Sequence, residues 1–201
     1  MGESTRPRAD VVLLAAGRSS RMGQPKGLVP FQGRPWIDAQ LERLAGRRVI
    51  VVLGHDRGRY LEAVPSLGRP GGALAVVVNP DPDRGPFSSL QVGLAVVASG
   101  AAFVLPIDVP AAAPRVWEAL EDALQPGVDA VLPVLDARGG HPVLLAPSFI
   151  ALLRGRNPSD PAIRLDLELA AAHTVRVGVT DPRVRLNLNA PEDWGKLVEG
   201  S

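Results

Sequence analysis

The stretch Val11-Val12-Leu13-Leu14-Ala15-Ala16-Gly17 passes from a short apolar run directly into small residues. A continuous, β-branched run of this length is typical of a strand that is buried on both faces of a sheet. Because ligands bind at the carboxyl ends of strands in open parallel sheets, we expect a ligand-binding loop to follow. That loop combines small residues with positive charge through Gly17, Ser19, Ser20, Arg21 and Lys26.

The rest of the chain alternates between strand-like and helix-like segments. Apolar runs predict four more strands over residues 49–53, 74–78, 102–105 and 130–134. Helical spacing predicts helices over residues 35–44, 88–98, 114–124 and 191–198. An added strand is expected over residues 139–145 and a loop over residues 154–162. Strands that alternate with helices imply right-handed βαβ units, so we expect a three-layer α/β/α sandwich, Rossmann-like, with a mostly parallel sheet.

Length and composition limit the classes of function. The 201 residues fit one domain over 1–201, with a core at about 10–198 and no linker. The net charge is +1 without a Lys/Arg run, so nucleic acid is not an expected partner. No apolar stretch is long enough to span a bilayer and the N-terminus is polar, which predicts a cytoplasmic protein without a membrane partner. The chain has no cysteine, which excludes disulfides and thiolate chemistry.

The loop after the first strand suits a polyphosphate better than a neutral ligand. Small residues let backbone N–H groups approach a ligand closely, and Ser19 and Ser20 can donate to phosphate oxygens. Arg21 and Lys26 supply positive charge where a triphosphate would lie. The loop is not a Walker A loop, since Lys26 follows a proline and precedes a glycine, and it lacks the G-x-G-x-x-G pattern of dinucleotide sites.

Five segments resemble, in order along the chain, the NTP-transferase superfamily that includes molybdenum cofactor cytidylyl- and guanylyltransferases. They are Leu-Ala-Ala-Gly-x-Ser-x-Arg-Met-Gly-x-x-Lys at 14–26, Gly-Pro-Phe-Ser-Ser-Leu-Gln-Val-Gly-Leu at 85–94, Pro-Ile-Asp-Val-Pro at 106–110, Gly-His-Pro-Val-Leu at 140–144 and Asn-Leu-Asn-Ala-Pro-Glu-Asp-Trp at 187–194. The first is the specific signature loop, and together they cover nearly the whole chain. The resemblance implies a nucleotide-diphospho-sugar transferase-like fold.

The resemblance also implies roles for individual residues. Nucleotide contacts are expected from Leu14, Ala15, Ala16, Gly17, Ser19, Ser20, Arg21, Lys26, Ser88, Ser89 and Gly93. Lys26, Arg21 and Asp108 are the expected catalytic residues of a Mg²⁺-dependent nucleotidyltransferase, and Asp108 is the expected metal ligand. His141 is a candidate for acceptor binding.

Three of these assignments have alternatives. Asp108 follows an apolar run and stands before a proline, so it lies at a strand's carboxyl end, where an aspartate can also cap the next helix. His141 can instead be a turn histidine that is bonded to backbone. Asn187 and Asn189 stand where the superfamily has aspartates; an amide oxygen can ligate Mg²⁺ but brings no charge. Metal binding at this closing segment is therefore left open.

The resemblance implies transfer of a nucleoside monophosphate from an NTP, with CTP preferred to GTP, to molybdopterin. The base preference follows from Ala16, because Leu-Ala-Ala-Gly resembles the cytidylyl branch and Leu-Ala-Gly-Gly the guanylyl branch. A sugar phosphate or another small phosphorylated acceptor is the alternative within the enzyme class. A non-catalytic nucleotide-binding homologue is the alternative outside it. The molybdenum branch also leaves open contact with a molybdoenzyme or a cofactor carrier protein.

Overall fold

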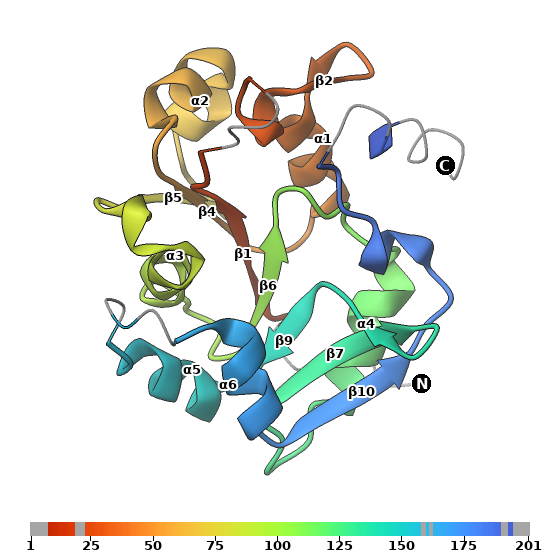
Figure 1. Cartoon of the computed structure of the whole chain (residues 1–201). Helices are drawn as coiled ribbons and strands as arrows, with labels where there is room; N and C mark the ends of the chain where they lie inside the picture. Colours follow the sequence, from red (N-terminus) through yellow and green to blue (C-terminus); the bar gives the residue numbers. More distant parts are fainter. Residues whose placement is uncertain (1–7, 19–22, 158–159, 161–162, 190–192, 195–201) are drawn as a thin grey trace.

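The structure is a computed structural model that describes residues 8–18, 23–157, 160, 163–189 and 193–194. A central sheet organises the chain, and helices cover both of its faces (Figure 1). Its strands are β1 (Asp10–Ala15), β4 (Val49–Leu53), β5 (Leu74–Val78), β6 (Ala102–Pro106), β7 (Ala130–Leu135), β8 (Arg138–Gly139), β9 (Val143–Leu145) and β10 (Thr174–Gly178), while β2 (Pro30–Phe31) and β3 (Arg34–Pro35) form a separate pair. The helices are α1 (Trp36–Arg43), α2 (Arg57–Ala63), α3 (Pro86–Leu94), α4 (Pro114–Ala123), α5 (Pro147–Arg154) and α6 (Leu165–Ala171), with 3₁₀ turns η2 (Lys26–Leu28), η3 (Pro65–Gly68), η4 (Pro82–Arg84) and η5 (Pro182–Arg185).

The strand order places a crevice between β1 and β6. Across the sheet the order is β10-β7-β9-β6-β1-β4-β5, with β8 paired to β7. Strand β1 runs parallel to both β4 and β6, whereas β9 is antiparallel to β6 and β7. The chain adds β4 and β5 on one side of β1 and then returns to add β6 on the other. In open α/β sheets such a reversal of strand order is where ligands bind, beyond the carboxyl ends of the strands.

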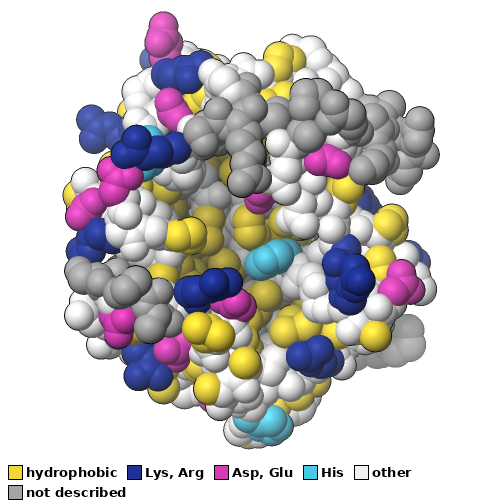
Figure 2. All heavy atoms as spheres, in the orientation of Figure 1, with side chains coloured by type: hydrophobic (Ala, Val, Ile, Leu, Met, Phe, Trp, Pro, Cys, Tyr) yellow, Lys and Arg dark blue, Asp and Glu magenta, His cyan; other side chains and the backbone are white. Residues whose placement is uncertain are grey.

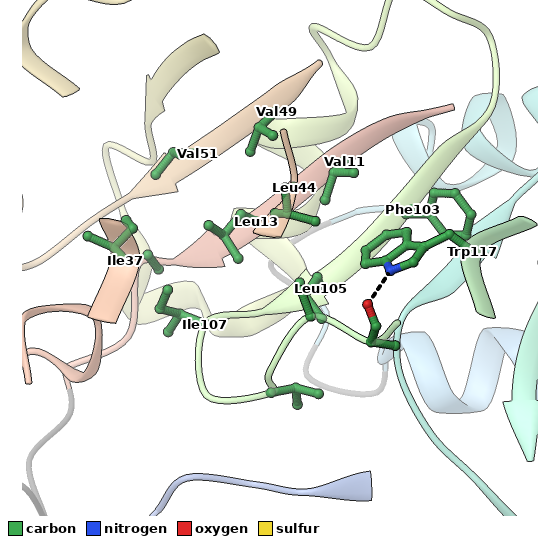
Figure 3. Close-up of a cluster of buried hydrophobic side chains, with 14 of the residues drawn as sticks. Val11, Leu13, Ile37, Leu44, Val49, Val51, Phe103, Leu105, Ile107 and Trp117 are labelled. Carbon is green, nitrogen blue, oxygen red and sulfur yellow. Dashed lines mark hydrogen bonds between the residues drawn. The ribbon is translucent and has the colours of Figure 1, made fainter. Parts of the chain in front are cut away.

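The sheet is buried on both faces because successive residues of its central strands point to opposite sides. Val11 and Leu13 of β1 pack with helices α1 and α4, whereas Val12 packs with α3 and α5. All three are fully buried, which explains why the run is continuously apolar. Figure 3 shows the first cluster, in which side chains of β1, β4 and β6 converge on Ile37 and Trp117.

The expected fold class is confirmed, and most expected elements are present. The predicted strands at 49–53 and 74–78 coincide with β4 and β5, and the others are longer by one or two residues. The prediction of a single strand over 139–145 is wrong, because the structure has two short strands, β8 and β9, with a break between them. The helix expected over 191–198 lies outside the described residues, apart from residues 193–194.

The sequence did not lead us to expect α2, α5, α6, β10, the β2–β3 pair or the 3₁₀ turns. The loop expected over 154–162 is described only at residues 154–157 and 160. Among the described residues, no helix is both long and apolar enough to cross a membrane.

Candidate functional site

A cavity of about 550 Å³ opens at the carboxyl ends of β1 and β6. The face seen in Figure 2 is hollowed near its centre, and hydrophobic side chains form much of the floor. A volume of this size is ordinary for a small-molecule site. The lining includes many residues that the sequence predicted as site residues, namely Leu14, Ala15, Ala16, Gly17, Lys26, Ser89, Asp108 and Asn189.

Three predicted site residues from distant parts of the chain meet at one point of this cavity. Lys26 Nζ donates to Asp108 Oδ2 at 2.6 Å and to Asn189 Oδ1 at 2.7 Å. The side chains of Lys26 and Asp108 keep 19% and 22% of their surface exposed, so the pair can be reached from the cavity. One cation, one carboxylate and one amide oxygen therefore face the same small volume.

Two side chains of helix α1 hold the loop after β6, which carries the carboxylate. Trp36 Nε1 donates to the carbonyl of Ile107 at 2.6 Å. Gln40 is fully buried; its Nε2 donates to the carbonyl of Val109 at 2.7 Å, and its Oε1 accepts from the N–H of Ala111 at 2.9 Å. The two residues are four positions apart and so lie on one helix face. Sequence reasoning missed this support, because the partners of Gln40 lie far along the chain.

The closing segment reaches the cavity through the same loop. The N–H of Leu188 donates to the carbonyl of Asp108 at 2.8 Å, which brings Asn189 against the lysine. Asn187 differs: it is exposed, its Nδ2 lies 3.4 Å from the Arg185 carbonyl, and it is outside the cavity lining. Only one of the two predicted asparagines is therefore placed beside the carboxylate.

The part of the cavity wall at Ser89 is ordered by a buried asparagine that sequence reasoning missed. Asn79 Nδ2 donates to Ser88 Oγ at 2.8 Å and to Ser89 Oγ at 2.9 Å. Ser88 Oγ in turn donates to the Gly85 carbonyl at 2.8 Å. Of the two serines only Ser89 lines the cavity, because Ser88 is occupied in holding the turn. Asn79 follows the strand-like run 74–78 directly, and that position was the available signal.

Gly93, predicted to contact the nucleotide, lies under the cavity wall and not in it. A Cβ atom there would clash with Val12 Cγ1 and would lie 2.8 Å from Val52 Cγ2. A glycine at this position lets helix α3 pack directly on strands β1 and β4. Close packing of helix on sheet thus accounts for the residue, and the cavity lining does not include it.

The rim of the cavity carries a charged cluster that the sequence did not reveal. Arg18 donates to both carboxylate oxygens of Asp83, with contacts of 2.6 to 3.0 Å, and His55 Nε2 lies 3.2 Å from Asp83 Oδ1. The hydrogen bonds from Arg18 are the main cause that lowers the pKa of the Asp83 carboxyl. Nearby, Tyr60 Oη accepts from the N–H of Gly27 at 3.0 Å, and burial raises the pKa of Tyr60 to about 12.

His141 lies beside the site without lining the described cavity. Its Nδ1 is buried and has no hydrogen-bond partner among the described residues. Burial lowers the pKa of His141, against the opposing effects of a hydrogen bond with the Val104 backbone and of the Asp108 charge. The lowered pKa favours the neutral ring, and its buried Nδ1 is the nitrogen without a partner among the described residues. The acceptor-binding role of His141 stays a prediction.

Ser19, Ser20 and Arg21 fall outside the described residues, so their predicted contacts with the nucleotide stay predictions.

The chemistry of the described part of the site fits a magnesium ion. Mg²⁺ is bound by one or two protein carboxylates and keeps water and phosphate oxygens as its other ligands. Asp108 and Asn189 supply one carboxylate and one amide oxygen within hydrogen-bond reach of the same atom. No group of three or more His, Cys, Asp or Glu residues that could hold a metal exists in the described part of the chain.

Comparison with known proteins assigns the family. The profile of the MobA-like NTP transferase domain matches residues 11–165. The molybdenum cofactor guanylyltransferase of Xanthomonas euvesicatoria pv. vesicatoria is 30% identical over 197 residues, which cover 93% of each chain. The molybdenum cofactor cytidylyltransferase of Escherichia coli K12 is 23% identical over 188 residues, which cover 92% of this chain and 93% of the relative.

The fold is shared with solved structures. Rv0371c of Mycobacterium tuberculosis H37Rv, in a crystal structure with manganese, superposes with a TM-score of 0.70 and 24% identity, covering 96% of this chain and 100% of that one. That likeness concerns the fold, whereas the profile and the 30% identical relative concern the sequence. The chain therefore belongs to the MobA-like NTP transferase family.

Proposed function

We propose that this protein transfers a nucleoside monophosphate from an NTP to a small phosphorylated acceptor and releases pyrophosphate. The observation that carries the proposal is the meeting of Lys26, Asp108 and Asn189 in a cavity at the switch point of the sheet. Two relatives similar over most of the chain are named for transfer to the molybdenum cofactor, which supports molybdopterin as the acceptor. Mg²⁺ is the proposed metal, and contact with a molybdoenzyme or cofactor carrier remains part of this proposal.

The chemistry follows from positioning and charge. An oxygen of the acceptor phosphate attacks the α-phosphorus, the bond to the β-phosphate breaks, and pyrophosphate leaves with the bonding electrons. The acceptor phosphate is already ionised, so no general base is needed. Lys26 places positive charge beside the transferred phosphate, and such fixed charge favours the transition state. When bound by Asp108 and the Asn189 amide, Mg²⁺ would neutralise phosphate charge and orient the leaving group.

We also propose that CTP is preferred to GTP. Ala16 lies at the end of β1, is 5% exposed and lines the cavity. It packs tightly on the neighbouring loop, since a Cβ at Gly54 would lie 2.6 Å from the Ala16 carbonyl oxygen and 2.8 Å from its Cβ. The methyl group therefore fixes the separation between the two loops that border the base. A narrow separation favours a pyrimidine over a purine.

One observation favours a function of another class. The closing segment brings an amide to the cavity where a carboxylate would strengthen metal binding, and Asn187 points elsewhere. A nucleotide-binding homologue without turnover is consistent with that loss of charge. Within the enzyme class, a sugar phosphate or a phospholactate-like acid would use the same cavity.

Pyrophosphate release separates these functions. The protein is mixed with Mg²⁺, each of the four NTPs and, in turn, molybdopterin or a panel of sugar phosphates. We expect release only with molybdopterin, and faster with CTP than with GTP. Release with a sugar phosphate alone would support the other acceptor class. Thermal stabilisation by NTP without release for any acceptor would contradict an enzymatic function.

A further inference from the structure

The proposed metal ligands are held by an ammonium group of the same chain. Lys26 Nζ bridges Asp108 Oδ2 and Asn189 Oδ1 at 2.6 and 2.7 Å. Magnesium binds oxygen ligands at about 2.0–2.1 Å in near-octahedral geometry. The space between these two oxygens therefore holds either the ammonium or the ion.

The charges of Lys26 and Asp108 favour the ammonium over a metal ion when no nucleotide is bound. Lys26 cancels the charge of the Asp108 carboxylate, and Asn189 adds none. Because Asp108 Oδ2 and Asn189 Oδ1 already contact the Lys26 ammonium, the nucleotide-free protein offers a divalent ion a carboxylate whose charge is balanced. A triphosphate changes this, because it brings several negative charges that attract the lysine and oxygens that complete the ligand shell of the metal.

We infer that Lys26 is an internal competitor of the divalent cation, so that the protein takes up the metal together with NTP and not before it. This inference rests on the proposed function. The polyphosphate draws Lys26 from Asp108 and thereby opens the carboxylate to the ion. By linkage, NTP and metal then raise each other's affinity by the same factor, and couplings between sites are typically about 5–150-fold.

The residue at position 189 determines how strongly Lys26 weakens metal binding. With asparagine at position 189, the Lys26 ammonium balances the charge of the Asp108 carboxylate. An aspartate there would leave one carboxylate for the metal even while the lysine stays bound. The asparagine is thus the feature that makes metal uptake depend on nucleotide, and its replacement tests the inference without removing Lys26.

The chain offers a matched control for the loss of a positive charge. Arg18 also lines the cavity, but it is paired with Asp83 by contacts of 2.6 to 3.0 Å. Removing Arg18 lowers the positive charge of the cavity by the same amount as removing Lys26. It leaves the bond between Lys26 and Asp108 in place.

The experiment measures binding of Mn²⁺ to nucleotide-free protein by electron paramagnetic resonance of the free ion. We expect weak binding by the wild type, and dissociation constants lower by about 5–150-fold in Lys26→Met and in Asn189→Asp. Arg18→Met should resemble the wild type. The double variant Asp108→Asn, Lys26→Met should lose the gain, which locates the ion at Asp108. CTP binding by the wild type is measured with and without Mn²⁺ and should tighten with the ion.

Three outcomes would overturn the inference: wild-type binding as tight as that of Lys26→Met, an equal gain in Arg18→Met, or no gain in Asn189→Asp. Failure of the proposed function has a different signature. In that case the wild type binds no CTP with or without Mn²⁺, whereas the nucleotide-free titrations still report on the competition.

Discussion

The side chain of Asp108 faces the cavity, and the backbone carbonyls of its two neighbours, Ile107 and Val109, accept hydrogen bonds from helix α1. Replacement by asparagine keeps the shape of the side chain and removes its charge. We expect Asp108→Asn to lower the rate of pyrophosphate release by at least about 10²–10³-fold, because charge placed at a transition state contributes that much. Release is measured with saturating CTP and acceptor, and circular dichroism checks that the fold is kept. Near-normal Mg²⁺-dependent turnover would remove Asp108 from the metal site.

Ala16 allows a test of base preference at a single methyl group. The methyl group is buried against Gly54, so its removal leaves free space at the end of β1 and frees the backbone. We expect Ala16→Gly to weaken the preference for CTP over GTP. The change should be modest, since one methyl group in a pocket is worth roughly 1–3 kcal/mol.

Competition binding of CTP and GTP to both proteins measures this effect. A ratio that does not change on substitution would assign base choice to another part of the cavity, such as the wall around Ser89. A wild type that prefers GTP would show that the sequence-based expectation for Ala16 is wrong.

At the scale of elements, local pattern predicted the strands that are continuous apolar runs, including the edge strand β5, and failed for the mixed strand β10 and the very short strand β9. Strands β4 and β5 are short apolar runs whose ends coincide with the expected ones. Strand β10 is an edge strand that carries Arg176 and has no fully buried residue, so its pattern is weak. Strand β9 is three residues long and lies antiparallel between β6 and β7, a position set by partners distant in sequence.

The site was predictable where a residue directly follows a buried strand, as Asp108 and the loop at 14–17 do. It was not predictable where a contact joins distant segments. Asn189 meets Lys26 across 163 residues, and Gln40 reaches Val109 across 69. No local pattern encodes such distances, so the bridging lysine and the support from helix α1 could be found only in three dimensions.

Helix α1 allows a prediction about the support of Asp108. Gln40→Met keeps the length of the side chain but leaves the Val109 carbonyl and the Ala111 N–H without their partner. Unpaired buried groups cost about 1–3 kcal/mol each, so stability should fall. We also expect kcat to fall by about 10²-fold with little change in the KM for NTP, because a displacement of about 1 Å in a catalytic group has that effect.

Gln91→Met is the matched control for this prediction. Gln91 Nε2 donates to the carbonyls of Leu153 and Arg156, and it joins helix α3 to the segment at the end of α5, away from the cavity. The control should lose stability without a selective loss of kcat. Equal kinetic effects in both variants would show that Gln40 acts only through stability.

For the whole molecule, the position of the cavity follows from the path of the chain. The reversal of strand order places the loops after β1 and β6 side by side, and the register sets Leu14 beside Pro106 at their origin. The extra strands β7, β9 and β10 extend the sheet on the β6 side, and η5 with the closing segment returns from there to the cavity. The sheet thus brings the loop after β1, the loop after β6 and the closing segment to one cavity.

His141 is a half-buried ionisable group whose charge the fold disfavours. Burial lowers the pKa of His141 in the folded protein below the value of about 6.5 expected for the unfolded chain. Below pH 6.5 the unfolded chain takes up a proton that the folded protein does not, so the free energy of unfolding falls as pH falls toward the folded pKa. Above pH 6.5 this contribution does not change with pH.

Replacement of His141 by asparagine removes the group and should flatten this dependence. The free energy of unfolding, from urea titrations at pH 7.5 and 5.5, should drop less in His141→Asn than in the wild type, by up to about 1.4 kcal/mol. The comparison is between slopes, so a uniform loss of stability in the variant does not affect it. His173→Asn, which removes an exposed histidine, controls for the loss of a ring as such. Equal slopes in the wild type and His141→Asn would mean that the folded protein accepts the proton at His141, which would contradict the lowered pKa of this group.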